Sequence, residues 1–202
     1  MDNFFQQNYI IELLNMKILR NILIIFSLPL IIPLIALSCF LIFLEDGLPV
    51  IFKQQRLGEN EFPFEIYKIR TMKKATKEAG THEIDPSMHL FFGSFLRKIK
   101  FDEFLQLINV LNGQLNLIGP RPGLITQLEL AQERRKLDLF SIKPGVTGLS
   151  QVCGCNMSNP SFLAKVDRIY LENKSFLLDL MIIMATLTGI YRKTLKRKFQ
   201  ID

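Results

Sequence analysis

One long stretch without charge constrains the fold of this chain most. No side chain in residues 22–44 is charged, whereas Lys17 and Arg20 precede the stretch and Glu45 follows it. As a straight helix it would be about 35 Å long, at about 1.5 Å per residue, which is enough to cross a hydrocarbon layer of about 30 Å. It is too long, and begins too late, for a signal peptide. The sequence therefore predicts a membrane helix.

Two prolines near the middle of this stretch leave its path open. Pro29 and Pro33 each lack an N–H, and each ring clashes with the carbonyl four residues back, so we expect a kink. The hydroxyls of Ser27 and Ser38 can bond the backbone groups that the prolines free. A bent helix can enter one leaflet and return to the same side, whereas an ordinary kinked helix crosses. The residues alone favour neither path.

The chain as a whole has the composition of a folded protein. The 202 residues are 49% hydrophobic, which argues against intrinsic disorder, and the length is sufficient for one compact core. An odd number of cysteines, 3 in all, favours a reducing compartment. Cys153 and Cys155 lack a CxxC spacing or paired histidines, so we interpret them as small thiols in a core rather than metal ligands.

Short elements are expected after the apolar stretch. Residues 50–52 and 64–69 have the pattern of two strands around a polar turn at 58–60. Residues 73–87 form a polar loop without an apolar period, and a helix is expected from Ser87 toward Lys98. These segments predict a β-hairpin followed by helices.

The segment from Phe101 to Leu111 predicts one amphipathic helix, because its apolar residues recur with helical spacing. Asp102 and Glu103 fall off the apolar face, in the first turn, where the helix dipole favours ionised carboxylates. Arg97 and two lysines lie just upstream. A solvated charged face is the simpler interpretation of this pair, and a reactive site is the alternative.

Two rigid turns contain Pro, Gly and a basic residue each. Residues 119–123 include Arg121, and residues 143–148 begin with Lys143. Such turns can hold cations and backbone N–H groups around an anion such as phosphate, or simply connect helices. Neither matches a nucleotide-binding glycine motif.

The C-terminal region pairs an apolar segment with a basic one. Residues 176–191 are strongly apolar but too short to span, so we expect a surface or core helix there. Residues 192–198 carry five cations, which suits an anionic lipid surface. Nucleic acid is not expected as a partner, because no recognised binding motif accompanies the net charge of +6.

Taken in order, these segments resemble the bacterial sugar transferase family, the small monotopic phosphoglycosyl transferases. The resemblance covers roughly residues 17–198, beginning with the proline-containing apolar helix. The other matching stretches are residues 50–58, 64–72, 95–97, 102–107, 109–113, 119–122, 143–152, 167–170 and 176–180.

The resemblance implies a mostly helical α+β fold. Residues 1–16 would be an N-terminal extension and residues 17–46 a re-entrant membrane helix. Residues 47–202 would be a small cytoplasmic catalytic domain, with a short β-hairpin and amphipathic helices on the membrane surface. The protein would lie on the cytoplasmic face of the bacterial inner membrane, and assembly as a homodimer is left open.

The resemblance also implies an activity. Members move a sugar phosphate from a UDP-sugar to polyprenyl phosphate and release UMP. By this resemblance Asp102 is the nucleophile, which forms an aspartyl-phosphosugar, and Glu103 helps to hold Mg²⁺ or handles a proton. Asp102 and Glu103 together are the expected metal ligands. Arg97 and Arg121, and more weakly Lys143, are the candidates for phosphate contacts.

Three departures from the family pattern bear on this interpretation. The usual Ser-Pro break is absent, and Ser27 with Pro29, or Pro33, takes its place. Leu105 stands where Pro is common, and Cys155 stands where an arginine associated with substrate binding is usual. A catalytically degenerate member that acts as a membrane adaptor in a glycan assembly complex is therefore the alternative hypothesis.

Overall fold

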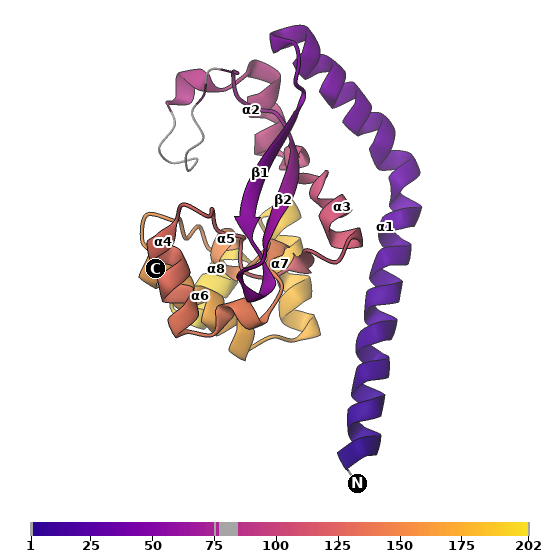
Figure 1. The fold of residues 1–202 in the computed structure, drawn as a ribbon, viewed down its shortest axis with the longest axis vertical. Helices are drawn as coiled ribbons and strands as arrows, with labels where there is room; N and C mark the ends of the chain where they lie inside the picture. Colours follow the sequence, from indigo (N-terminus) through magenta and orange to yellow (C-terminus); the bar gives the residue numbers. More distant parts are fainter. Residues whose placement is uncertain (1, 75, 77–84, 202) are drawn as a thin grey trace.

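The N-terminal helix is the longest element of the fold and lies along one side of the body (Figure 1). The computed structural model describes residues 2–74, 76 and 85–201, and the side chains from residue 17 onward within these ranges, Pro86 excepted. Helix α1 (Asp2–Asp46) is continuous over 45 residues. The expected boundary at residue 16 therefore falls inside a helix. The polar loop expected at residues 73–87 lies largely outside the described residues.

Helix α1 bends but is not interrupted. Pro29 and Pro33 both lie inside it, and Figure 1 shows its C-terminal part curving over the top of the body. The bend agrees with the kink expected from Pro29 and Pro33, because a proline removes one backbone hydrogen bond while the turns on either side keep theirs. The break at Ser27, Pro29 or Pro33 that the resemblance implied does not interrupt the helix.

The serine hydroxyls of α1 bond carbonyls other than those expected. Ser27 Oγ donates to the carbonyl of Ile24 at 2.7 Å, and Ser38 Oγ donates to that of Leu34 at 2.8 Å. The carbonyls that lose their usual donor lie four residues before each proline. The two serines therefore do not take over the hydrogen bonds that the prolines remove.

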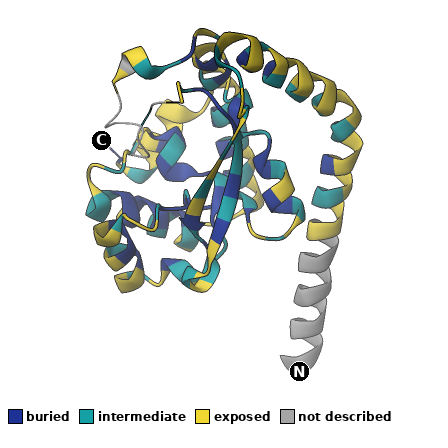
Figure 2. Cartoon of the chain, turned by 45° about the horizontal axis from the view of Figure 1, so that its top comes forward, coloured by how far each residue is buried: buried dark blue, intermediate teal, exposed yellow. Residues whose placement is uncertain are grey.

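An antiparallel hairpin forms the centre of the body, as expected. Strand β1 (Ile51–Leu57) pairs with β2 (Pro63–Ile69) from Ile51 opposite Ile69 to Leu57 opposite Pro63. The first strand is longer than predicted, and the 3₁₀ turn η1 (Glu59–Glu61) closes the hairpin. Phe64 and Ile66 of β2 are buried on one face of the hairpin, and Ile69, on the other face, is buried in a separate cluster (Figure 2).

The helix after the polar loop begins later than predicted. A 3₁₀ turn η3 (Pro86–Met88) comes first, and α2 runs over Phe91–Lys98. Between them the chain is extended, because His89 bridges Met72 and the Leu90 N–H donates to the Thr71 carbonyl at 3.1 Å. Because His89 and Leu90 pair with the chain just after β2, the helix begins only at Phe91.

The single helix predicted over residues 101–111 is wrong. The structure has a 3₁₀ turn η4 (Phe101–Glu103) followed by α3 (Gln106–Leu111). Lys100 adopts a left-handed conformation with φ 57°, which ends the preceding helix and turns the chain. The apolar spacing is the same for both arrangements, so it could not separate them.

A short parallel pair brings the two Pro/Gly turns together. Strand β3 (Asn116–Ile118) pairs with β4 (Gly145–Thr147). The Gly119 N–H donates to the Thr147 carbonyl, and the Gly145 N–H donates to the Pro120 carbonyl, both at 2.9 Å. The backbones approach so closely that a Cβ on Gly145 would lie 2.1 Å from the Gly119 nitrogen.

Helices pack around this pair and enclose the largest cluster of buried apolar residues. They are α4 (Leu128–Lys136), η5 (Leu139–Ser141), α5 (Leu149–Val152), α6 (Pro160–Glu172), α7 (Phe176–Thr188) and α8 (Arg192–Phe199). Val166, Tyr170 and Ile182 are among the residues of this core. The whole is a mostly helical α+β fold, as expected.

The apolar C-terminal segment proves to be both a core and a surface helix. Ile182 of α7 is fully buried, whereas Phe176 and Leu187 on the same helix are at least 70% exposed. In α8, Leu195 is buried and the basic side chains around it are exposed. One face of each helix therefore packs on the core.

The close contact between the Pro/Gly turns predicts a stability effect. Gly145→Ala should lower the free energy of unfolding by about 1–3 kcal/mol, because the added methyl forces two backbones apart. The matched control is Gly123→Ala, whose Cβ would meet its nearest neighbour at 3.4 Å, an ordinary contact. Thermal unfolding in detergent measures both; equal melting temperatures for the two variants would contradict the prediction.

Candidate active site

The carboxylate pair predicted from the sequence lies at the centre of the body, where the chain leaves α2. The Lys100 N–H donates to the Arg97 carbonyl at 3.0 Å, and the next residues form η4, which carries Asp102 and Glu103. Asp102 is only 6% exposed. The interpretation of this pair as a solvated charged face is therefore wrong.

Glu103 joins three separate parts of the chain. Its Oε1 lies 2.6 Å from Lys68 Nζ on β2 and 3.2 Å from Arg121 Nη2 in the turn after β3. The side chains of Glu103 and Lys68 are each 14% exposed. The structure thus brings the predicted residues Glu103 and Arg121 together and adds Lys68, which sequence reasoning did not select.

The two carboxylates have opposite electrostatic environments. Burial raises the pKa of Glu103, but the charges of Lys68 and Arg121 outweigh it and hold that pKa well below its usual range. Burial raises the pKa of Asp102 above its usual range, and Lys68 opposes this only in part. Glu103 is therefore ionised at neutral pH, whereas Asp102 is a poorly solvated carboxylate.

Cations surround this pair in excess. Burial lowers the pKa values of Arg56, Lys68, Arg97 and Lys100, and Glu103 favours the charged form of each. A pocket beside Glu103 is lined by residues from the hairpin, from α3 and from both Pro/Gly turns: Arg56, Ile66, Lys68, Gln106, Arg121, Pro122, Gly145 and Val146. The excess of buried positive charge suits a ligand with several negative charges.

Arg56 fastens the hairpin to the turn that carries Arg121. Its Nη1 donates to the Pro122 carbonyl at 3.1 Å, and the adjacent Leu57 N–H donates to the Gly123 carbonyl at 3.0 Å. Arg56 is 9% exposed. This residue was not selected from the sequence either, because nothing in the pattern of a strand shows which distant loop it will meet.

The other two predicted phosphate-binding residues have different surroundings. Arg97 Nη1 lies 2.5 Å from His89 Nε2, and arginine is the donor because its guanidinium has no acceptor. Lys143 Nζ lies 3.9 Å from Glu59 at the hairpin turn, and Lys143 is not among the residues that line the pocket beside Glu103. The second turn instead contributes Gly145 and Val146 to that pocket.

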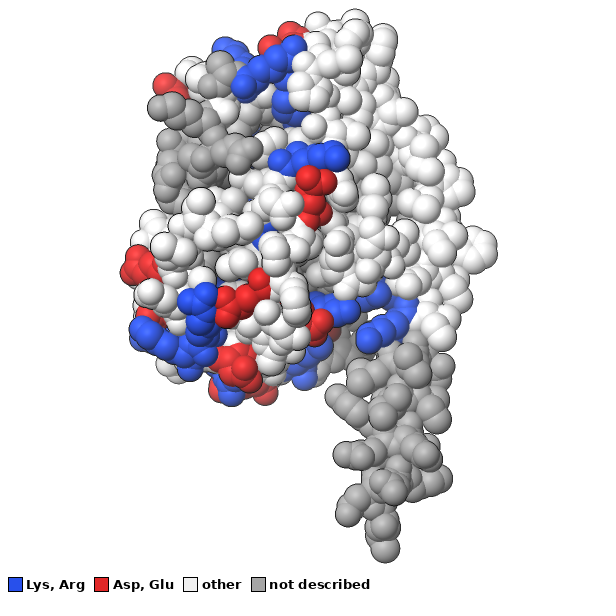
Figure 3. Space-filling view, in the orientation of Figure 1, with Lys and Arg blue, Asp and Glu red and all other residues white. Residues whose placement is uncertain are grey.

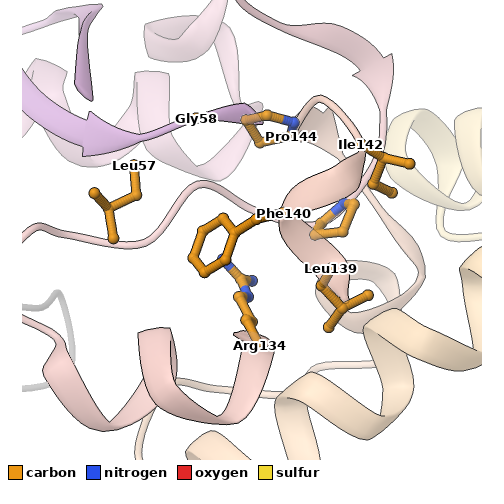
Figure 4. Close-up of a pocket in the computed structure, with 8 residues that line it drawn as sticks. Leu57, Gly58, Arg134, Leu139, Phe140, Ile142 and Pro144 are labelled. Carbon is orange, nitrogen blue, oxygen red and sulfur yellow. The ribbon is translucent and has the colours of Figure 1, made fainter. Parts of the chain in front are cut away.

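A second pocket lies between the hairpin turn and the helical layer (Figure 4). Its walls include Leu57, Leu139 and Phe140, with Arg134 beside the Phe140 ring. Arg134 Nη2 donates to Asp167 at 2.7 Å, with both side chains at most 4% exposed. This buried ion pair joins α4 to α6 and has a structural role.

The side chains that could hold a metal ion are histidines, cysteines, aspartates and glutamates. Within the described residues, no three His, Cys, Asp or Glu side chains are grouped as metal ligands. Cys153 is buried and Cys155 half-buried, both as free thiols, and burial raises the pKa of Cys153 to about 11. The interpretation of these cysteines as small thiols of the core is therefore confirmed for Cys153 and holds in part for Cys155.

The surface of α1 is apolar between its charged ends (Figure 3). Within the described residues, Lys17–Asp46 is the one helix long and apolar enough to cross a membrane, with a mean hydropathy of 2.7 over its best window. Large apolar side chains such as Phe26 and Leu30 are at least 73% exposed. Fold and site together show a protein with one long apolar helix, a carboxylate pair largely shielded from solvent and a pocket lined by cationic side chains.

The comparison with known proteins identifies the family. The chain belongs to the bacterial sugar transferase family, whose model matches residues 13–193. An uncharacterized sugar transferase of Bacillus subtilis, EpsL, is 39% identical over 147 residues, which cover 73% of this chain and 72% of that protein. The resemblance stated from the sequence is thus confirmed.

Two longer relatives have names that state an activity. The UDP-glucose:undecaprenyl-phosphate glucose-1-phosphate transferase of Caulobacter vibrioides is 30% identical over 78% of this chain and 62% of its own length. The UDP-N-acetylgalactosamine-undecaprenyl-phosphate N-acetylgalactosaminephosphotransferase of Aeromonas hydrophila is 32% identical over 82% of this chain. The match spans 41% of the Aeromonas protein.

The Glu103 ion pairs predict a pH-dependent stability effect. Glu103→Gln leaves Lys68 and Arg121 without their carboxylate and should lower the free energy of unfolding by about 1–3 kcal/mol at pH 7. Because the pKa of Glu103 is lowered in the folded protein, this contribution is complete above the ordinary glutamate pKa of about 4.3. It is lost as the pH falls through the lower, folded-state pKa.

Glu61→Gln is the matched control for that measurement. Glu61 pairs with Arg135 at 2.5 Å, but Arg135 is 53% exposed, so the loss should stay below about 1 kcal/mol. Melting curves of both variants and the wild-type protein at pH 7 and at acid pH give the comparison. An equal loss of stability in the two variants would show that the ion pairs of Glu103 stabilise the fold no more than an exposed ion pair does.

Proposed function

We propose that the protein transfers a sugar phosphate from a UDP-sugar to polyprenyl phosphate and releases UMP, an initiating step of bacterial glycan assembly. The observation that carries the proposal is the buried Asp102–Glu103 pair among an excess of cations. Membership of the sugar transferase family and the activities named for the relatives support the same reaction class.

In the first half-reaction Asp102 acts as the nucleophile. A carboxylate oxygen of Asp102 attacks the phosphorus bonded to the sugar, the bond from that phosphorus to the bridging oxygen breaks, and UMP leaves. Burial supports this role, because a poorly solvated carboxylate loses little hydration when it reacts. The product is an aspartyl-phosphosugar.

In the second half-reaction the lipid takes the place of UMP. A phosphate oxygen of the polyprenyl phosphate attacks the same phosphorus, and the bond to Asp102 breaks, which restores the carboxylate. Dividing the transfer in this way allows one pocket to serve both bulky substrates in turn.

The cations of the pocket stabilise charge during both steps. Lys68 and Arg121 both contact Glu103, so their positions are set before substrate binds. They can offset the charge that develops on the leaving phosphate. Because the pKa of Glu103 is held low, we propose that Glu103 orients these cations and does not transfer a proton.

The site fits Mg²⁺ as an ion shared with substrate. Mg²⁺ prefers oxygen ligands and is commonly bound by one or two carboxylates together with substrate phosphates. Asp102 and Glu103 supply that number of carboxylates from one turn, and within the described residues no third acidic or histidine ligand joins them. Bound there, the ion would offset negative charge on the diphosphate.

The contacts of α1 support a re-entrant path. Ile24 packs with Phe64 of the hairpin and Val110 of α3, whereas Ile42 packs with Ile69 and α2 residues. About 27 Å of helix separates these contacts, at about 1.5 Å per residue, which is close to the thickness of the hydrocarbon layer. A polar body cannot contact both ends of a helix that crosses the membrane, so these contacts support a path in which both ends lie on one side.

Other apolar surfaces agree with a position at a membrane. Phe91, Phe95 and Ile99 repeat every four residues from α2 to the residue after it, and each is more than half exposed. The exposed face of α7 and the basic side chains of α8 add a second such surface. We propose that these helices rest on the cytoplasmic face of the inner membrane, where nucleotide sugars are available.

The nucleophile assignment predicts the loss of turnover. With a panel of UDP-sugars, undecaprenyl phosphate and Mg²⁺, the wild-type protein should release UMP with at least one donor, and Asp102→Asn should reduce turnover by at least about 10³-fold, because an amide cannot form the acyl phosphate. Without the lipid, wild-type protein should release no more than one UMP per active site.

Controls separate this reaction from the adaptor hypothesis. Asp138→Asn changes an exposed aspartate at a left-handed turn and should leave turnover unchanged. EDTA in place of Mg²⁺ should abolish UMP release. Unchanged turnover in Asp102→Asn would contradict the nucleophile assignment, and wild-type protein without turnover on any donor would favour a membrane adaptor.

The re-entrant path predicts the sidedness of the two ends of α1. Single cysteines at Phe5 and Asn60, in a variant that lacks the native cysteines, should both react with an impermeant maleimide only when the cytoplasmic face is open to the reagent. Inverted and right-side-out vesicles provide the comparison. Labelling from opposite faces would establish a spanning helix.

A further inference from the structure

The end of the membrane helix contacts the helix that leads into the carboxylate pair. Glu45, the last residue but one of α1, accepts hydrogen bonds from the first two N–H groups of α2. Its Oε1 lies 2.5 Å from the Phe91 nitrogen and its Oε2 lies 3.0 Å from the Phe92 nitrogen. The residue before α2 is Leu90, which cannot cap a helix with its side chain. The cap of α2 is therefore supplied by α1.

Helix α2 is held at the same end by tight packing. Gly93 lies against the chain just after β2, where a Cβ would come 2.4 Å from the Thr71 carbonyl oxygen. Beside it, Asp46 pairs with Arg70 at 3.0 Å, and Arg70 Nη2 donates to the Gly47 carbonyl at 2.8 Å. The end of α1, the end of β2 and the start of α2 thus form one joint.

The other end of α2 continues directly into the site. The Ile99 N–H donates to the Phe95 carbonyl at 3.2 Å, and the Lys100 N–H donates to the Arg97 carbonyl at 3.0 Å. The left-handed residue Lys100 then turns the chain, and the next residues form η4. Because α2 is short and the turn is tight, a shift at its first turn moves the backbone that carries Asp102.

We infer that Glu45 is a positioning residue for the transfer reaction: by capping α2 from the membrane helix, it fixes the backbone that carries Asp102 relative to the membrane. The inference rests on the proposed function. The contact between Glu45 and α2 would then align the reacting groups as well as stabilise the fold, because the lipid phosphate is confined to the membrane surface while the nucleophile lies in the body. An error of about 1 Å in such an alignment can lower a rate by about 10²-fold.

The test separates the rate of the chemical step from the number of folded sites. UMP release is followed after mixing enzyme with Mg²⁺ and the UDP-sugar that the donor panel identifies, without lipid. The amplitude of the burst counts active sites, and its rate constant reports the attack by Asp102. Glu45→Gln keeps the size of the side chain and removes its charge, and because Glu45 is exposed no group is left buried in the core.

The matched control removes a cap from a helix that carries no pocket residue. Ser175 caps α7 by accepting a hydrogen bond from the Leu178 N–H at 3.3 Å. Ser175→Ala and Glu45→Gln should lower the melting temperature by similar amounts, since each loses one capping hydrogen bond: the serine loses its only acceptor, and the glutamine amide keeps one of the two acceptor oxygens of Glu45. The burst amplitude should be unchanged in both variants, and the rate constant should fall by at least about tenfold only in Glu45→Gln.

The remaining outcomes overturn the inference. A normal rate constant in Glu45→Gln, a loss confined to the burst amplitude, or an equal loss of rate in Ser175→Ala would each show that Glu45 contributes stability alone. Wild-type protein that releases no UMP from any donor would contradict the proposed function, and the inference with it.

Discussion

The ion pairs of Glu103 are the interaction on which the site depends. One carboxylate oxygen contacts Lys68 on β2 and Arg121 in the turn after β3, so three segments far apart in the chain meet at one atom. Lys68 and Arg121 are both partly shielded from solvent and would repel each other without this carboxylate between them. Arg56 and Arg97 add further positive charge near Glu103. The adjacent Asp102 is buried, and burial together with the charge of Glu103 raises its pKa.

The second constraint is the contact of α1 with the body at two distant points. Ile24 and Ile42 belong to different buried clusters, and Arg20 Nη1 donates to Asn116 Oδ1 at 3.3 Å beside the first of them. An apolar helix that is long enough to cross a membrane is thereby held along one side of a polar domain. In the proposed re-entrant arrangement, lipid contact and substrate chemistry occur on the same face of the membrane, and the hydrogen bonds of Glu45 connect the two.

The agreement between sequence and structure differs from one element to another for physical reasons. The hairpin and the long helix were predictable because alternation and an uncharged run depend on neighbours in the chain. The single helix over residues 101–111 was wrong, because apolar spacing cannot register a left-handed residue at Lys100. Asp102, Glu103 and Arg121 were found through ordered motifs. Lys68 and Arg56 were missed, although both lie in matching stretches, because a strand pattern shows which face a residue occupies and not which loop will meet it.

The sequence by itself determined the family, the membrane helix and the carboxylate pair, since each of these is a property of local composition or of ordered motifs. Only the tertiary structure decided that Asp102 is buried, that Glu103 is paired twice and that Lys143 lies outside the pocket. The tertiary structure also decided that α1 stays one continuous helix and that it packs against the body. Burial and ion pairing are set by residues many positions away along the chain, so the charge and solvation of these groups become defined only when the hairpin, the turns and the membrane helix pack together.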